Sequence, residues 1–197
     1  MELLLIRHAR PLRAHGGTGP ADPALSPLGT RQAEALADWL AAEKIDAVYS
    51  SPLRRAQETA APLAARLGLP VALSEAVSEY DADAVEYIPM EELKAAGDPR
   101  WNEVPQMLPE FQQRVIDGIE AIVGAHPSGR IAVVCHGGVV NVYTAWVVGV
   151  RSGMFFLPHY TSISRVLASS SGGNRSVDTL NETPHLRLAD VPLTELG

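Results

Sequence analysis

Several features that many proteins depend on are missing from this sequence. Of its 197 residues one is cysteine, Cys135, so no disulfide can form within the chain and a reducing compartment is the simpler expectation. A membrane-spanning helix needs about 20 predominantly apolar residues, and no stretch approaches that length. The N-terminal apolar run, Leu3 to Ile6, ends at Arg7 and is too short for the core of a signal peptide. We therefore expect a cytoplasmic protein that makes no contact with membranes.

Positive charge is also scarce. The sequence has 16 lysines and arginines against 23 aspartates and glutamates, which gives a net charge of −7. Because general binding to nucleic acid requires a basic surface, this balance argues against a nucleic-acid partner. It does not argue against a small anionic ligand, since a few arginines set the electrostatic field of a cleft. The length suits one large core, so we expect a single domain over residues 1–197.

Apolar segments of strand length alternate with segments of helical periodicity. Strands are expected at residues 2–6, 45–49, 70–73, 131–135, 163–167 and 175–180, and helices at 27–42, 52–67, 108–126 and 137–146. This alternation is typical of an α/β fold, here a three-layer sandwich with a mostly parallel central sheet and helices on both faces. Residues 14–25 are expected to form a loop, and the tail after Pro184 an irregular segment. An acidic excursion at about 74–110 is expected to cover the site and to set specificity.

Two of the expected strands end in residues that can bind an oxyanion. Arg7 and His8 follow the first strand, and His136, Gly137 and Gly138 follow the strand at residues 131–135. In open α/β folds, the crevice that binds ligands lies at the carboxyl ends of the parallel strands. Glycine lets backbone amides approach an oxyanion closely. Two imidazoles beside an arginine therefore suggest a site for phosphate.

A pair of arginines opens the helix after the second strand. Arg54 and Arg55 lie in its first turns, where the helix dipole disfavours positive charge. Arginine at such a position suggests that an anion binds at that end of the helix. The alternative is an exposed arginine paired with Glu58, which suits Arg54 better than Arg55.

Together these segments resemble the histidine phosphatase superfamily, the phosphoglycerate-mutase-like proteins. Four motifs occur in the family's order over nearly the whole chain. They are Arg7-His8-Ala9, Leu25-Ser26-Pro27-Leu28-Gly29-Thr30-Arg31-Gln32-Ala33, Ser51 through Ala60, and His136-Gly137-Gly138. The resemblance identifies Arg55 as the arginine of the site. Residues 10–25 lack the Glu-Ser-x-Trp-Asn segment of the mutase branch, which favours a phosphatase.

Residue chemistry and resemblance both imply hydrolysis of a phosphomonoester, a small phosphorylated metabolite, through a phosphohistidine. His8 is expected to attack phosphorus as an unprotonated imidazole. The predicted phosphate-binding groups are Arg7, Arg55, His136 and Gly137, and His136 is also expected to take part in catalysis. No metal or cofactor is expected, because guanidinium and imidazolium groups supply the positive charge.

The resemblance also implies a general acid soon after the third strand, where two glutamates are candidates. Glu79 follows Val77 in the family's spacing, but the glycine usual after it is missing, so Glu75 stays as the second candidate. Arg10 stands where many members have glutamate. Its side chain either contacts a second anionic group of the substrate or faces solvent.

Two other functions fit the same motifs. A phosphoglycerate-type mutase would return the phosphoryl group to its substrate, and a non-catalytic phosphate-binding module would keep the fold without turnover. The segment Asp81-Ala82-Asp83 matches the pattern of magnesium-dependent aspartate phosphatases, but Ser78-Glu79-Tyr80 precedes it where those enzymes have a hydrophobic strand. A polar loop is therefore favoured there. The motifs leave the oligomeric state open.

Overall fold

A six-stranded sheet forms the centre of the molecule, for which the computed structural model describes residues 1–102, 108–150, 154–169 and 173–194. The strands lie in the order β4-β3-β6-β1-β7-β8. Their bounds are β1 Glu2–Arg7, β3 Ala47–Ser50, β4 Val71–Leu73, β6 Arg130–Cys135, β7 Ile163–Ala168 and β8 Arg175–Glu182. The first four in this order pair in parallel, whereas β7 and β8 are antiparallel. The predicted mostly parallel sheet is confirmed, with an antiparallel pair at one edge.

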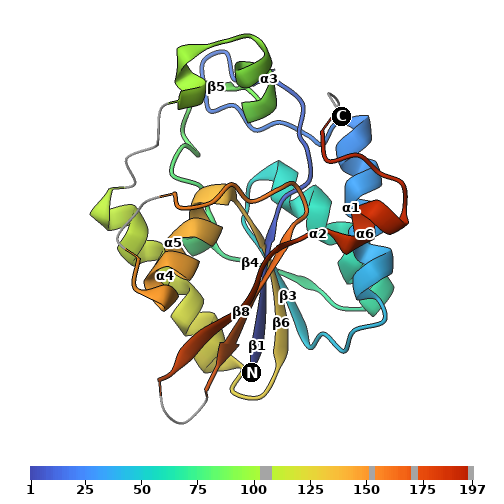
Figure 1. Cartoon of the computed structure of the whole chain (residues 1–197), viewed down its shortest axis with the longest axis vertical. Coiled ribbons are helices and arrows are strands. Elements are labelled where there is room, and N and C mark those ends of the chain that lie inside the picture. The colour runs from blue at the N-terminus through green and yellow to red at the C-terminus, as the bar shows by residue number, and fades with distance from the viewer. Residues whose placement is uncertain (103–107, 151–153, 170–172, 195–197) are drawn as a thin grey trace.

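Helices cover both faces of the sheet (Figure 1). Helices α1 (Pro27–Leu40) and α2 (Arg54–Leu67) pack together on one face, and α4 (Pro109–Ala125) and α5 (Gly137–Val148) on the other. This is the three-layer arrangement that the alternating pattern predicted. None of the helices in the described part of the chain has the length and apolar character that a membrane span requires.

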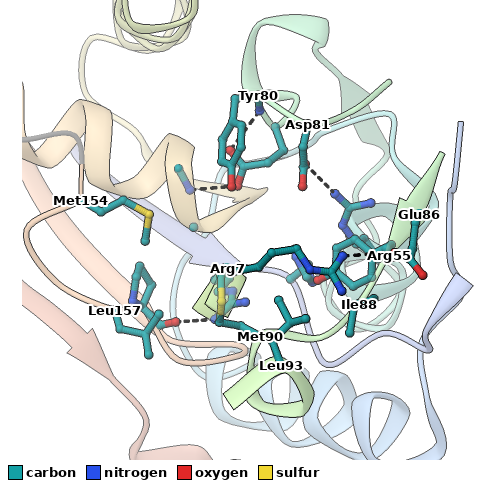
Figure 2. Close-up of a pocket in the computed structure, with 17 residues that line it drawn as sticks. Arg7, Arg55, Tyr80, Asp81, Glu86, Ile88, Met90, Leu93, Met154 and Leu157 are labelled. Carbon is teal, nitrogen blue, oxygen red and sulfur yellow. Dashed lines mark hydrogen bonds and ion pairs between the residues drawn. The ribbon is translucent and has the colours of Figure 1, made fainter. Parts of the chain in front are cut away.

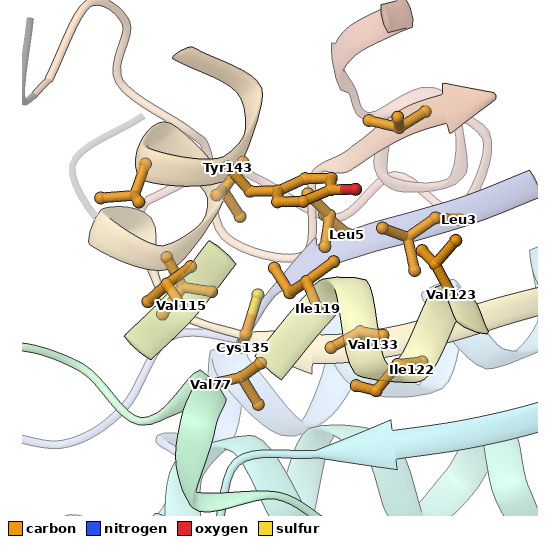
Figure 3. Packing of buried hydrophobic residues seen from close by; sticks show 14 of the residues in the cluster. Leu3, Leu5, Val77, Val115, Ile119, Ile122, Val123, Val133, Cys135 and Tyr143 are labelled. Carbon is orange, nitrogen blue, oxygen red and sulfur yellow. The ribbon is translucent and has the colours of Figure 1, made fainter. Parts of the chain in front are cut away.

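Strand β1 is buried on both of its faces. Its residues Leu3, Leu4, Leu5 and Ile6 have no exposed surface. Because successive strand residues point to opposite faces, Leu3 and Leu5 join the cluster drawn in Figure 3, with α4 and α5. Leu4 and Ile6 join the second cluster, with α1 and α2. A central parallel strand needs apolar residues on both faces, which explains the continuous apolar run.

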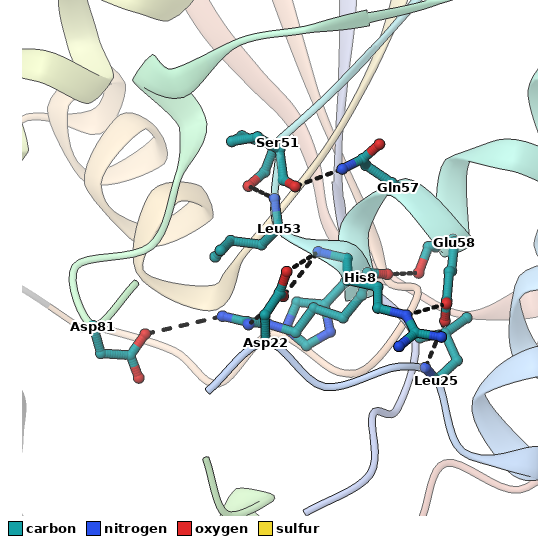
Figure 4. Close-up of polar contacts among 12 residues, drawn as sticks. His8, Asp22, Leu25, Ser51, Leu53, Gln57, Glu58 and Asp81 are labelled. Carbon is teal, nitrogen blue, oxygen red and sulfur yellow. Dashed lines mark hydrogen bonds and ion pairs between the residues drawn. The ribbon is translucent and has the colours of Figure 1, made fainter. Parts of the chain in front are cut away.

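Helix α2 begins later than predicted and is capped by a distant residue. The prediction placed its start at Pro52, but the first helical residue is Arg54, and Leu53 before it provides no side-chain cap. Instead, both carboxylate oxygens of Asp22 accept hydrogen bonds from the Arg54 amide, at 2.9 and 3.1 Å (Figure 4). Asp22 thus supplies from another segment the acceptor that orphaned amides at a helix start require.

The tail after Pro184 is helical at its start, so the prediction of an irregular tail was wrong. Helix α6 spans Pro184–Leu188. Leu186 is buried in a small cluster with Leu28 and Ala35 of α1. Such a short helix is stabilised by its docking onto α1, and five residues show no periodicity from which a helix can be predicted.

The segment between β4 and α4 lies above the end of the sheet at which the parallel strands finish (Figure 1). It contains the short helices η1 (Glu75–Val77), α3 (Met90–Ala95) and η2 (Pro99–Asn102), and the strand β5 (Glu86–Tyr87). We call residues 75–102 the cap. Strand β5 pairs with β2 (Ala14–His15), so part of the predicted loop 14–25 is a strand. Of the predicted excursion at 74–110, residues 103–107 lie outside the described residues and Pro109 begins α4.

The first turn of α1 is expected to tolerate no side chain at Gly29. A β-carbon there would lie 1.9 Å from the carbonyl oxygen of Arg10. Backbone atoms cannot yield as a flexible side chain can, so Gly29→Ala should lower the free energy of unfolding by about 1–3 kcal/mol. Urea denaturation measures this change.

The matched control is Gly124→Ala in α4, where a β-carbon meets nothing within 4 Å. Replacing that helical glycine should stabilise the protein by up to about 1 kcal/mol. Equal stability of the two variants would contradict the close packing at Gly29.

Candidate active site

A cavity of about 650 Å³ lies at the carboxyl ends of β1 and β6. Its inner lining includes the predicted site residues Arg7, His8, Arg55, Glu79 and Gly137 (Figure 2). The register of the parallel pair aligns Arg7 with Cys135, so His8 and His136 leave the sheet side by side. Their ring centroids lie 5.1 Å apart. The structure thus gathers the residues that the motifs predicted for phosphate binding.

His8 is held as a neutral imidazole with one free nitrogen lone pair. The ring is buried, and its Nδ1 lies 2.8 Å from the carbonyl oxygen of Ala9. Because a carbonyl oxygen only accepts hydrogen bonds, Nδ1 carries the proton, and Nε2 of the neutral ring is unprotonated. Burial, then the nearby Arg55 and Arg7, hold the pKa of His8 well below its usual value. Near neutral pH the ring is therefore a competent nucleophile.

Thr59 of α2 holds the backbone that orients His8. Its hydroxyl oxygen accepts a hydrogen bond from the Ala9 amide at 2.9 Å and donates one to the Arg55 carbonyl oxygen at 2.6 Å. By accepting one hydrogen bond and donating another, the hydroxyl links the end of β1 to the first turn of α2. Thr59 belongs to the Ser51–Ala60 motif, although the sequence interpretation assigned it no role.

Tyrosine rings cover both guanidinium groups of the site. The Arg7 guanidinium carbon lies 4.1 Å from the ring centre of Tyr160, and that of Arg55 lies 4.7 Å from the ring centre of Tyr87. Arg7 also donates a hydrogen bond to the Pro158 carbonyl oxygen at 2.6 Å. These contacts fix the plane of each guanidinium, which favours bidentate binding of oxyanions. Neither tyrosine was identified from the sequence.

The two neighbouring arginines at the start of α2 have opposite environments. Arg55 is 2% exposed and lines the cavity, with Asp22 and Asp81 each 4.0 Å from its guanidinium nitrogens. Arg54 is exposed and pairs with Glu58 at 2.7 Å. The placement matches the distinction that the sequence drew between them.

Several buried nitrogen atoms around His8 lack a hydrogen-bond partner. They are Nε of Arg7, Nε of Arg55, and both ring nitrogens of His136. A buried polar group without a partner costs about 1–3 kcal/mol, so such groups are uncommon and call for an explanation. A phosphate, with several acceptor oxygens, matches this set of nitrogens. The pKa of His136 is held well below its usual value by burial, Arg55 and His8, and a bound dianion would act in the opposite direction.

Glu79 is a buried carboxyl group that lines the cavity. It is 9% exposed, and Oε2 accepts a hydrogen bond from the Gly138 amide at 2.8 Å. Burial, followed by the nearby Asp81, raises its pKa to about 7. A β-carbon at Gly138 would lie 2.2 Å from Oε1, so the second glycine of the His-Gly-Gly motif makes room for this carboxyl. Glu75, the other candidate acid, is exposed and does not line the cavity.

Arg10 neither faces solvent nor lines the cavity. Its side chain is 4% exposed and forms ion pairs with Glu91 and Glu92 of α3, both at 2.7 Å. Tyr160, which covers Arg7, donates a hydrogen bond to the same Glu91 at 3.1 Å. Arg10 thus joins the end of β1 to the cap, and its predicted contact with substrate stays a prediction.

Asp81 lines the cavity, although the sequence pattern around it suggested only a polar loop. One of its oxygens is buried without a hydrogen-bond partner and lies 4.0 Å from Arg55. Asp83, the second aspartate of the segment, is exposed. In the described part of the chain no three His, Cys, Asp or Glu residues are grouped to hold a metal ion.

Comparison with known proteins places this geometry in a family. The model of the histidine phosphatase superfamily, branch 1, matches residues 3–183. Phosphoserine phosphatase 1 of Hydrogenobacter thermophilus is 33% identical over 152 residues, which cover 69% of this chain and 71% of that protein.

Two solved structures share the fold. A phosphoserine phosphatase of Entamoeba histolytica gives a TM-score of 0.72 at 23% identity, covering 94% of this chain and 98% of that chain. A mycobacterial glucosyl-3-phosphoglycerate phosphatase gives a TM-score of 0.74 at 21% identity, and the match covers 92% of this chain and 99% of that chain. As its four motifs predicted, the chain belongs to the histidine phosphatase superfamily and is an enzyme that hydrolyses phosphate esters.

Proposed function

We propose that this enzyme hydrolyses small phosphomonoesters through a phosphohistidine on His8, without a metal ion. The observation that carries the proposal is the group of buried, unpartnered nitrogens of Arg7, Arg55 and His136 around His8. Arginine and imidazole donors in a buried cavity stabilise charge on a transferring phosphoryl group, which is the main requirement of this chemistry.

In the first step, the Nε2 lone pair of His8 attacks phosphorus while the ester P–O bond breaks. Arg7, Arg55 and the Gly137 amide bind the non-bridging oxygens, and His136 donates to them as the dianion raises its proton affinity. Glu79, protonated because of its raised pKa, gives its proton to the departing alkoxide. The products are a neutral alcohol, a phosphohistidine and a Glu79 carboxylate.

In the second step, a water molecule hydrolyses the phosphohistidine. The Glu79 carboxylate takes a proton from the water as its oxygen attacks phosphorus, and the P–Nε2 bond breaks. Inorganic phosphate leaves, His8 regains its lone pair, and Glu79 regains its proton. The Nδ1 proton of His8 stays on its hydrogen bond to Ala9 throughout, which keeps the ring in one orientation.

His8 should carry the phosphoryl group during turnover. Brief exposure to a labelled phosphomonoester in excess EDTA, followed by peptide mapping, should show acid-labile, base-stable phosphate on His8. His8→Ala should show neither label nor turnover while its circular dichroism stays that of the wild type.

The same reaction separates the rival functions. Release of inorganic phosphate supports a phosphatase, and return of the label to another position of the substrate would support a mutase. Label on Asp81, or activity that EDTA abolishes and magnesium restores, would overturn the metal-free histidine mechanism.

Arg55 and Arg54 form a matched pair for testing the phosphate site. Lysine keeps the charge but cannot bind two oxygens from one planar group. We expect Arg55→Lys to lower kcat/KM by about 10²–10³-fold, as loss of an oxyanion donor does. Arg54→Lys, at an exposed residue, should stay within about twofold of the wild type. Steady-state kinetics on one substrate decide this, and similar losses in both variants would contradict the assignment.

Glu79→Gln should slow poor leaving groups far more than good ones. A general acid contributes about 10²–10⁴-fold, and a basic alkoxide needs its proton whereas nitrophenolate does not. Burst kinetics of the phosphorylation step should therefore show a severe loss for an alkyl phosphate and a small loss for nitrophenyl phosphate.

The pH dependence gives a second measure of the same group. The acid must be protonated, so kcat/KM for the alkyl ester should fall as pH rises through about 7, the pKa of Glu79. This alkaline limb should vanish in Glu79→Gln and persist in the control Glu75→Gln. A leaving-group-dependent defect in Glu75→Gln would transfer the role to that residue.

A further inference from the structure

The outer part of the cavity has an apolar wall. It is made by side chains from the cap and from the segment after α5, and Figure 2 labels most of them among the residues that line the cavity. These residues are Ile88, Met90, Leu93, Met154, Leu157 and Pro158. Leu157 is 44% exposed, although large apolar side chains gain by burial. A wall of this kind is suited to the non-reacting part of an apolar substrate.

The arginine side chains that line the cavity either face the phosphate subsite or pair with carboxylates of the protein. Arg7 and Arg55 face the phosphate subsite, as described above. Arg100, the other arginine in the lining, is held by Asp98 at 2.7 Å and by Glu86 at 3.3 Å. The described lining of this cavity holds no further lysine or arginine, and Lys94 lines an adjoining cavity that shares Met90, Leu157 and Pro158 with the wall. Among the described residues that line this cavity, a carboxylate on the leaving group would reach a cation outside the phosphate subsite only at Arg100, where it would compete with Asp98 and Glu86.

Carboxyl groups line the cavity as well. They are Glu79, Asp81 and Glu86. Burial raises the pKa of Asp81, and Arg55 at 4.0 Å acts in the opposite direction. A second anion on the substrate would be desolvated next to these groups, and desolvation of an unpaired charge is costly.

Resting on the function proposed above, we propose that the substrate is the phosphate ester of an apolar alcohol that carries no second anionic group. The apolar wall binds the alcohol while the two arginines bind the phosphate. This class differs from phosphoserine and phosphoglycerates, which carry a carboxylate beside the phosphate ester. The similar proteins whose names include those compounds are 33% identical or less to this chain, so their names do not decide its substrate.

A chain-length series tests the apolar wall. Burying one methylene contributes about 0.8 kcal/mol, which corresponds to about fourfold in kcat/KM when burial is complete. Because the wall is partly open, we expect kcat/KM to rise by about two- to fourfold per methylene from ethyl to hexyl phosphate. Steady-state release of inorganic phosphate measures the slope.

A matched pair of substrates tests the exclusion of a second anion. Butyl phosphate and 4-(phosphonooxy)butanoate have similar reach and differ by a terminal carboxylate. We expect the carboxylate to lower kcat/KM by about tenfold or more, which corresponds to about 1.4 kcal/mol. Phosphoserine and 3-phosphoglycerate should likewise be poorer substrates than butyl phosphate.

Two variants locate the effect in the wall. Leu93→Asn and Leu157→Asn should each flatten the chain-length slope, and using two variants guards against misfolding of either. Leu188→Asn is the control, because Leu188 is 74% exposed on α6 and does not line the cavity. Its slope should equal that of the wild type.

The outcomes separate this inference from the proposed function. Release of phosphate with a rising slope and discrimination against the carboxylate supports both. Release with a flat slope, or with preference for the carboxylate-bearing esters, overturns the apolar substrate class and leaves the phosphatase mechanism in place. Failure to release phosphate from any ester overturns both.

Discussion

The parallel pairing of β1 with β6 is the constraint on which the site depends. It aligns Arg7 with Cys135, and the His8 amide donates a hydrogen bond to the Cys135 carbonyl oxygen at 2.9 Å. Both strands are buried on both faces, so their register is fixed by packing on two sides. A slip of one residue would turn every side chain of a strand to the opposite face. The rigid sheet therefore sets the separation of the two imidazoles.

Around the two imidazoles, buried ionisable groups lie close together, which costs free energy of folding and shifts their pKa values. Burial, and then the guanidinium groups of Arg55 and Arg7, lower the pKa values of His8 and His136, which favours the neutral form of both rings. Burial of Glu79 in the same cavity raises its pKa to about 7. A raised pKa for an acid and a lowered pKa for a base in one cavity are typical of sites for proton transfer. The apolar clusters on both faces of the sheet offset the free energy that these groups cost.

The sequence predicted the parts of the site that rest on local signals. His8 and His136 follow buried strands, and Arg55 stands in a motif, so position along the chain was sufficient. Other contributions depend on tertiary proximity. Asp22 caps α2 from a different segment, and Asp81 and Tyr87 reach the cavity from the cap. None of these follows from periodicity or motif spacing, because each depends on how segments distant in the sequence pack together.

We expect two parts of the molecule to recognise the substrate, namely the ends of the core strands and helix α2 on one side and the cap on the other. The residues proposed to bind phosphate lie at strand ends and at a helix start, where the rigid core sets their geometry. In the proposed function the remainder of the substrate contacts the cap, which is attached by the β5–β2 pairing and by side-chain contacts. Arg10 provides such an attachment, because its ion pairs with Glu91 and Glu92 join α3 to the residue two places beyond His8. Glu91 also accepts a hydrogen bond from the Tyr160 hydroxyl, and the ring of Tyr160 covers the Arg7 guanidinium. The charge of Arg10, for which the sequence left open a contact with substrate or exposure to solvent, is thus used to attach the cap to the end of β1.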